Sequence, residues 1–163
     1  PVIFLEPKRI YRTAKAEVQE GAADDVLVPI GPARLVREGT DCSVFTYGAM
    51  VEVCEKAAAK LAEEDGASVE IVDLRTLTPV DESAILASVR KTGRAVIVAE
   101  APKTCSYAAE IAALVAEKAI DSLEAPVLRV AGFDTPYPYT LEAYYLPHPA
   151  RVVRALRETL QYR

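Results

Sequence analysis

Short β-rich runs alternate with longer helical stretches from residue 34 onward, and this alternation constrains the fold most. The run at residues 94–99 is uniformly apolar in its middle, as expected of a strand buried on both faces of a parallel sheet. The stretch that begins at Met50 repeats apolar residues at spacings of three and four up to Leu61, which is the pattern of one helix face. The alternation predicts a parallel sheet with helices on both faces.

Further strands are predicted at residues 42–47, 68–72 and 126–131, and residues 34–37 are a candidate edge strand. Thr78 and Pro79 suit the first turn of a second helix, with Asp81 closing the capping box. Thr104 suits the start of a third helix, and Pro149 the start of a last one.

Composition excludes several classes of function. The net charge of −5 disfavours binding to nucleic acid or to an anionic membrane, because both need a basic face. No apolar run approaches the roughly 18 residues that span a bilayer. The chain has one histidine and three widely spaced cysteines, so a structural zinc site is not expected. The glycine spacing matches neither the dinucleotide fingerprint nor the phosphate loop.

Ligands of open α/β sheets bind beyond the carboxyl ends of the strands, and here three loops lie at such ends. Two of them precede predicted helices, whose free N–H groups could face an anion. This possible anion pocket comprises Gly48, Ala49, Thr104, Cys105 and Ser106. Glu100 and Asp134 are the carboxylates of the three loops, either as an acid–base pair or, the preferred interpretation, as ion-pair or capping partners.

Eight short segments, in a fixed order, carry a resemblance to a known family. They include Glu-Pro-Lys at 6–8 and Gly-Phe-Asp-Thr-Pro-Tyr-Pro at 132–138, and the others are residues 11–12, 29–31, 73–77, 91–94, 100–102 and 123–126. In these segments the chain resembles the C-terminal part of the beta subunit of thiamine-diphosphate-dependent 2-oxo acid dehydrogenases, the branched-chain type more than the pyruvate type. Cys105 and Ser106 depart from the pattern, since relatives often carry two glycines there.

The resemblance implies a fold and a division of the chain. The fold would be a three-layer α/β/α domain like the transketolase C-terminal domain, with a five-stranded, mostly parallel sheet and an antiparallel edge strand. That edge strand, residues 34–38, would lie beside 68–72, although its position alone suggests a hairpin with 42–47. Residues 1–33 would be the end of a missing N-terminal domain plus a linker, and 34–163 the transketolase C-terminal-like domain. A start at Pro1, just before the strand-like residues 2–5, agrees with a piece of a longer chain.

The resemblance also implies a function, which is assembly and partner docking within an α2β2 heterotetramer. The parent enzyme would oxidatively decarboxylate a 2-oxo acid and reductively acylate a lipoyl group, in the bacterial cytoplasm or, less expected, the mitochondrial matrix. Thiamine diphosphate and Mg would bind elsewhere in that parent enzyme, so this chain alone would hold no catalytic, cofactor or metal residue.

Two sets of partner-binding residues follow from the resemblance. The partners would include the alpha subunit and the second beta subunit, and pairing of the two beta subunits, which supports the tetramer, would use Phe133, Asp134, Pro136, Tyr137 and Pro138. The basic subunit-binding domain of the dihydrolipoyl acyltransferase would dock through Asp121, Glu124 and the C-terminal carboxylate of Arg163, because an acidic surface attracts a basic partner.

Three alternatives remain open. One is the C-terminal domain of another transketolase-like thiamine diphosphate enzyme, and another is a small anion-binding α/β module. The last is a small-molecule site built from Glu100, Asp134 and Cys105.

Overall fold

The computed structural model describes residues 1–12, 15 and 28–162. At its centre lies a five-stranded sheet in the order β1-β3-β2-β4-β5. The strands are β1 (Arg34–Arg37), β2 (Cys42–Thr46), β3 (Val69–Asp73), β4 (Ala95–Pro102) and β5 (Leu128–Gly132). β1 runs antiparallel to β3, and the other three pairings are parallel. The predicted fold class is confirmed.

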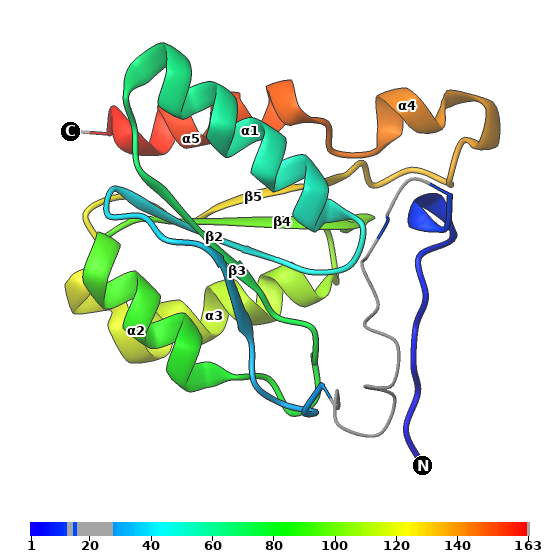
Figure 1. The fold of residues 1–163 in the computed structure, drawn as a ribbon, viewed down its shortest axis with the longest axis horizontal. Coiled ribbons are helices and arrows are strands. Elements are labelled where there is room, and N and C mark those ends of the chain that lie inside the picture. Colours follow the sequence, from blue (N-terminus) through cyan, green and yellow to red (C-terminus); the bar gives the residue numbers. More distant parts are fainter. Residues whose placement is uncertain (13–14, 16–27, 163) are drawn as a thin grey trace.

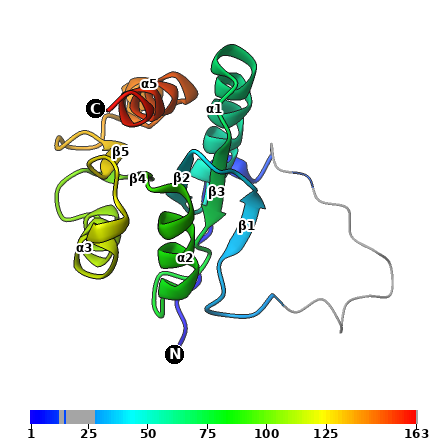
Figure 2. The ribbon, with the colours of Figure 1, turned by 90° about the vertical axis from the view of Figure 1, so that its left-hand side faces the viewer.

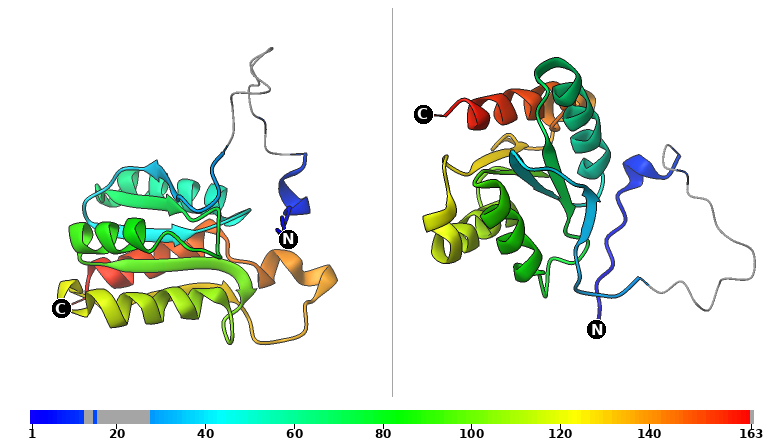
Figure 3. Two further views of the ribbon diagram at one scale, coloured as in Figure 1. Left: turned by 90° about the horizontal axis from the view of Figure 1, so that it is seen from below. Right: turned by 60° about the vertical axis from the view of Figure 1, so that its left-hand side comes forward.

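Helices cover both faces of the sheet (Figures 1 and 3). On one face lie α1 (Met50–Asp65) and α5 (Pro149–Leu160), and on the other α2 (Glu82–Thr92) and α3 (Tyr107–Ala119). Each layer has its own buried core, in which β2, β3 and β4 direct alternate side chains to opposite faces. The apolar face predicted from Met50 to Leu61 is buried throughout, and Gly66 ends α1 at a φ of 69°.

The edge strand β1 lies beside β3, with Leu35 opposite Val72, as the resemblance implies (Figure 2). The hairpin with residues 42–47 does not form, because the turn after β1 is bonded to Ser68, just before β3. The N–H groups of Thr40 and Asp41 donate to the Ser68 carbonyl at 3.0 and 2.8 Å, and the Asp41 carboxylate accepts the Ser68 N–H at 2.7 Å.

The start of α2 corrects the sequence prediction. The helix begins at Glu82, with Asp81 rather than Thr78 as its N-cap. The reason is that three donors converge on the Asp81 carboxylate. They are the Ala84 N–H at 3.0 Å, the Ser83 hydroxyl at 2.6 Å and the Ala33 N–H at 3.0 Å. The prediction for α5 is confirmed, since His148 is its N-cap and Pro149 its first residue.

Asp81→Ala should therefore destabilise the domain by about 1 kcal/mol near neutral pH, as expected for loss of an N-cap. The hydrogen bonds from Ser83, Ala33 and Ala84 lower the pKa of Asp81 below its usual value. The contribution of the carboxylate is thus complete above the unfolded pKa of about 3.9 and disappears as the pH falls through the folded pKa. Urea unfolding across this range measures it. Asp81→Asn should lower the free energy of unfolding less than Asp81→Ala does. If Asp81→Ala lowers it by the same amount at every pH, the expectation is contradicted.

Four short elements complete the described structure. They are η1 (Lys8–Ile10), η2 (Ile120–Ser122), η3 (Tyr139–Leu141) and α4 (Glu142–Tyr145). Ile10 of η1 packs against the core between the sheet and α1, so the N-terminal arm contacts the domain. Much of the predicted linker, at residues 13–14 and 16–27, lies outside the described residues. No helix in the described part of the chain has the length and apolar character needed to cross a membrane.

Candidate functional site

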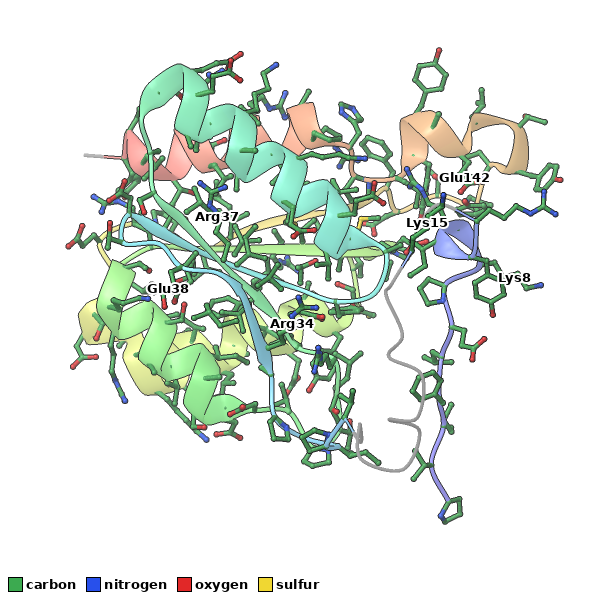
Figure 4. The ribbon with its side chains drawn as sticks, in the orientation of Figure 1. Lys8, Lys15, Arg34, Arg37, Glu38 and Glu142 are labelled. Carbon is green, nitrogen blue, oxygen red and sulfur yellow. The ribbon has the colours of Figure 1, made fainter. Side chains whose placement is uncertain are left out.

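The carboxyl ends of β2 and β4 meet at one end of the sheet, beside η1 and α4 (Figures 1 and 4). Tyr47 follows β2 and Glu100 lies near the end of β4, and both are half-buried. Burial raises the pKa of Glu100, while the nearby Arg9 lowers it and Glu142 raises it. Burial also raises the pKa of Tyr47, and the Glu100 carboxylate adds to that rise. Glu142, which Figure 4 labels, was not anticipated from sequence, because it lies 42 residues after Glu100.

Asp134 ties the loop after β5 to the loop after β4. Its carboxylate accepts the Thr104 N–H at 2.8 Å and the Thr104 hydroxyl at 2.7 Å. These bonds lower the pKa of Asp134. The preferred interpretation of Asp134 as a capping partner therefore agrees with its geometry. Thr104 does not cap α3, because the helix begins at Tyr107 and Ser106 stands at its N-cap position.

The predicted anion pocket involves the starts of α1 and α3. At α3 the Thr104 N–H already faces the carboxylate of Asp134, Ser106 is buried, and Cys105 is exposed at a φ of 57°. At α1 Ala49 is buried, and Pro7 of the arm lies 3.8 Å from where a Cβ of Gly48 would be. The pocket stays a prediction.

The three cysteines divide between core and surface, since Cys105 is exposed and the other two are buried. Cys42 and Cys54 are buried, and burial raises the pKa of each thiol to about 12, so both remain protonated at neutral pH. They pack as small apolar side chains. Within the described residues, no three His, Cys, Asp or Glu side chains come together to hold a metal ion.

The predicted interface residues lie in the long loop after β5. Tyr145 anchors this loop from beneath, with its ring edge-on to Phe133 and Tyr137 at centroid distances of 6.2 and 5.1 Å. The Arg151 guanidinium lies over Phe133, 4.6 Å from the ring centroid. Asp134 and Pro136 are exposed, and Pro138 is half-buried.

The exposed apolar area extends beyond the predicted residues. Tyr139 and Tyr144 are 86% and 76% exposed, and Leu141 joins them. We call the set Phe133, Tyr137, Tyr139, Leu141 and Tyr144 the aromatic surface. The dense tyrosines between Gly132 and Pro147 were the available signal, but sequence does not show which of them face outward. A cluster of exposed aromatic side chains is typical of a protein interface.

The predicted docking residues lie at the opposite end of the sheet from the aromatic surface. Glu124 lies on the wall of a groove of about 530 Å³, which we call the docking groove. Asp41, Asp65 and Gln161 also line it. Asp121 is exposed in η2, whereas Arg163 lies outside the described residues. Because Leu160 and Gln161 line the groove, the C-terminal end of α5 reaches it.

Glu124 already has a partner within the chain. Its carboxylate lies 2.5 Å from the Arg94 guanidinium, although the Glu124 side chain is 59% exposed. Gly93 makes room for it, since a Cβ there would lie 2.9 Å from the carboxylate carbon. The pair was not predicted from sequence, because its members lie 30 residues apart.

Comparisons with known proteins agree with the fold described above. The family described as the C-terminal domain of transketolase matches residues 31–152. The pyruvate dehydrogenase E1 component subunit beta of Bacillus subtilis is 47% identical over 163 residues, which cover 99% of this chain and 49% of that protein. The mitochondrial 2-oxoisovalerate dehydrogenase subunit beta 2 of Arabidopsis thaliana is 44% identical over 162 residues, covering 99% and 44%.

The chain thus spans about half the length of these curated relatives. The similar identities do not separate the branched-chain type from the pyruvate type. Among solved structures, a split-gene transketolase described as an inactive beta4 tetramer aligns with a TM-score of 0.72 and 27% identity, over 85% of this chain and 44% of that one. A 2-oxoglutarate:ferredoxin oxidoreductase from Magnetococcus marinus, at 14% identity and a TM-score of 0.55 over 86% and 21%, shares the fold.

Proposed function

Since the chain belongs to the transketolase C-terminal domain family, we propose that it is the assembly and partner-docking domain of the beta subunit of a 2-oxo acid dehydrogenase. The observation that carries the proposal is the 44–47% identity to such beta subunits over 99% of the chain. The parent enzyme would oxidatively decarboxylate a 2-oxo acid and reductively acylate a lipoyl group, in the bacterial cytoplasm or the mitochondrial matrix.

The residues that the structure describes do not fit thiamine diphosphate with Mg²⁺. That ion prefers carboxylate and carbonyl oxygens in octahedral geometry, supplied together with the cofactor's phosphates. At the carboxyl end of the sheet both oxygens of Asp134 are bonded to Thr104, and the pKa of Glu100 is raised rather than lowered. We therefore place the cofactor in the other parts of the parent enzyme.

The isolated chain should accordingly show no heat of thiamine diphosphate binding in titration calorimetry with Mg²⁺ present. The matched control is the beta subunit extended by its N-terminal half and combined with the alpha subunit, which should bind the cofactor. Micromolar binding of thiamine diphosphate to the isolated chain would contradict the proposed assembly role.

Assembly would use the aromatic surface. Its residues project from a loop held in place by Tyr145 and by the bond between Asp134 and Thr104. Burying large aromatic side chains contributes about 25 cal/mol per Å² of apolar area, which suits a stable contact within an α2β2 tetramer. We assign this surface to contacts with the alpha subunit and the second beta subunit.

Docking of the acyltransferase would use the docking groove. Its lining includes three carboxylates, Asp41, Asp65 and Glu124, but also three cations, Lys91, Arg94 and Arg157. A basic partner must therefore compete with Arg94 for Glu124. Because both side chains reach solvent, such an exchange of partners costs little.

This competition predicts opposite effects of two substitutions in the assembled enzyme. Glu124→Ala should weaken binding of the basic subunit-binding domain about tenfold. Arg94→Ala should strengthen it, because it frees the same carboxylate. Surface plasmon resonance at several salt concentrations measures both, and decarboxylation with an artificial electron acceptor should be unchanged.

A matched control is Glu55→Ala, which removes an exposed carboxylate from α1. It should leave docking within twofold of the wild-type affinity. If Glu124→Ala behaves like Glu55→Ala, Glu124 lies outside the docking interface.

The alternative of another transketolase-like enzyme draws support from the split-gene transketolase, but at lower identity and coverage than the dehydrogenase beta subunits. An anion-binding module is disfavoured because Asp134 occupies the Thr104 N–H. A catalytic site of Glu100, Asp134 and Cys105 is disfavoured because Thr104 engages both oxygens of Asp134.

A further inference from the structure

The outer edge of β5 borders a second groove. β5 is the last strand in the sheet order, and among the described strands it pairs with β4 alone. A groove of about 420 Å³ follows the whole of β5 and continues to Asp134, with α5 as its far wall. It shares no residue with the docking groove. We call it the basic groove.

Four cations line the basic groove, namely Lys103, Arg129, Arg151 and Arg154. Among the described residues, none of these four forms an ion pair within 4.0 Å, whereas the cations that line the docking groove, Lys91, Arg94 and Arg157, each pair with a carboxylate. Two carboxylates, Asp134 and Glu158, also line the groove, and that of Asp134 is already bonded to Thr104. A concentration of unpaired positive charge stands out in a chain whose net charge is −5.

The four cations come from three different elements that line the groove. Lys103 comes from the loop after β4, Arg129 from β5, and Arg151 and Arg154 from α5. Arg129 donates to the Lys103 carbonyl at 3.0 Å. Arg151 donates to the carbonyls of Ala131 and Tyr145 at 2.6 and 3.2 Å. Two guanidinium groups are thus fixed in place, while Lys103 and Arg154 remain exposed.

The length of the groove argues for an extended occupant, because its lining follows β5 from Leu128 to Gly132 and continues to Asp134. Burial lowers the pKa of Arg151, and the nearby positive charge of Arg154 lowers it further. An anion between the two guanidinium groups would reduce this repulsion.

We propose that the basic groove binds an extended acidic segment of a partner protein, whose carboxylates pair with Lys103 and Arg154 along β5. Val130 and Ala155 supply an apolar floor for aliphatic side chains between those carboxylates. Charge complementarity along such a groove speeds association and selects acidic partners.

Fluorescence anisotropy of the 163-residue chain with a labelled peptide of alternating glutamate and valine tests this. The wild-type chain should bind the peptide, with an affinity that falls as salt rises. Arg154→Glu and Lys103→Glu should each weaken binding about tenfold. Because both side chains are exposed, both variants should unfold at the wild-type temperature, which circular dichroism checks.

Arg37→Glu is the matched control, because it makes the same change of charge on β1, at the opposite edge of the sheet (Figure 4). It should change the affinity less than twofold. The proposal is overturned if the acidic peptide does not bind, or if Arg37→Glu weakens it as much as Arg154→Glu. It is also overturned if a single-stranded oligonucleotide or inorganic phosphate displaces the peptide at equal charge concentration.

Discussion

Gly39→Ala is expected to lower the free energy of unfolding by about 3 kcal/mol, at the upper end of the usual cost of overpacking. A Cβ at residue 39 would lie 2.2 Å from the Glu70 backbone nitrogen and 2.3 Å from the Val69 carbonyl carbon. These are main-chain atoms of β3, held between β1 and β2, so they cannot retreat as a flexible side chain would. Relief of the clash must displace the turn that joins β1 to β2. Urea denaturation measures the loss.

Gly66→Ala separates this clash from backbone strain. Gly66 has a φ of 69°, but no atom lies within 4 Å of its would-be Cβ. Gly66→Ala should therefore lower the free energy of unfolding only through strain in the left-handed backbone conformation, by about 1 kcal/mol. If the two substitutions prove equally destabilising, the close approach of Gly39 to β3 is not what requires a glycine there.

Lys91→Met is expected to cost about 3 kcal/mol, because it leaves a buried carboxylate without its cation. The Glu70 side chain is only 3% exposed, and Lys91 reaches it from solvent to form an ion pair. The other Glu70 oxygen accepts a hydrogen bond from Ser88 at 2.6 Å, and Ser43 links Ser88 to Thr92 at 2.6 and 2.7 Å. This chain of hydroxyl groups fixes the carboxylate beneath α2, so it cannot move outward to water.

The converse substitution should be much milder. Glu70→Gln leaves the half-exposed Lys91 free to turn to solvent, and the amide oxygen can still accept the bond from Ser88. The double variant Glu70→Gln with Lys91→Met should recover most of the loss of Lys91→Met alone. A double-mutant cycle gives the coupling energy, and simple additivity of the two effects would contradict the proposed burial cost.

Both predictions rest on contacts that sequence analysis did not provide. Local pattern predicted the strands and the buried face of α1, because periodicity depends on neighbours in the chain. It misplaced the start of α2, because the third donor to Asp81 is Ala33, 48 residues away. Glu70 looked like one polar residue within an apolar run, and only packing against α2 shows its partners.

In the candidate site, too, some features depend on local sequence and others on contacts between distant residues. The loop after β5 was recognised from the resemblance at residues 132–138, which depends on consecutive residues of the chain. The pairs Asp134 with Thr104 and Glu124 with Arg94 each join residues 30 apart, so they depend on how β4 and β5 align. The position of β1 came from the resemblance rather than from periodicity, which favoured a hairpin.

The strand order also dictates a sequence of events during synthesis. β1 emerges first from the ribosome, yet its hydrogen-bonding partner is β3, with Leu35 opposite Val72. β2 and the whole of α1 must be made before that partner exists. Closing so long a loop carries an entropic cost that a hairpin would avoid. Of the five strands, β1 is therefore translated first, and both of its edges stay unpaired until the β2–α1–β3 unit is complete.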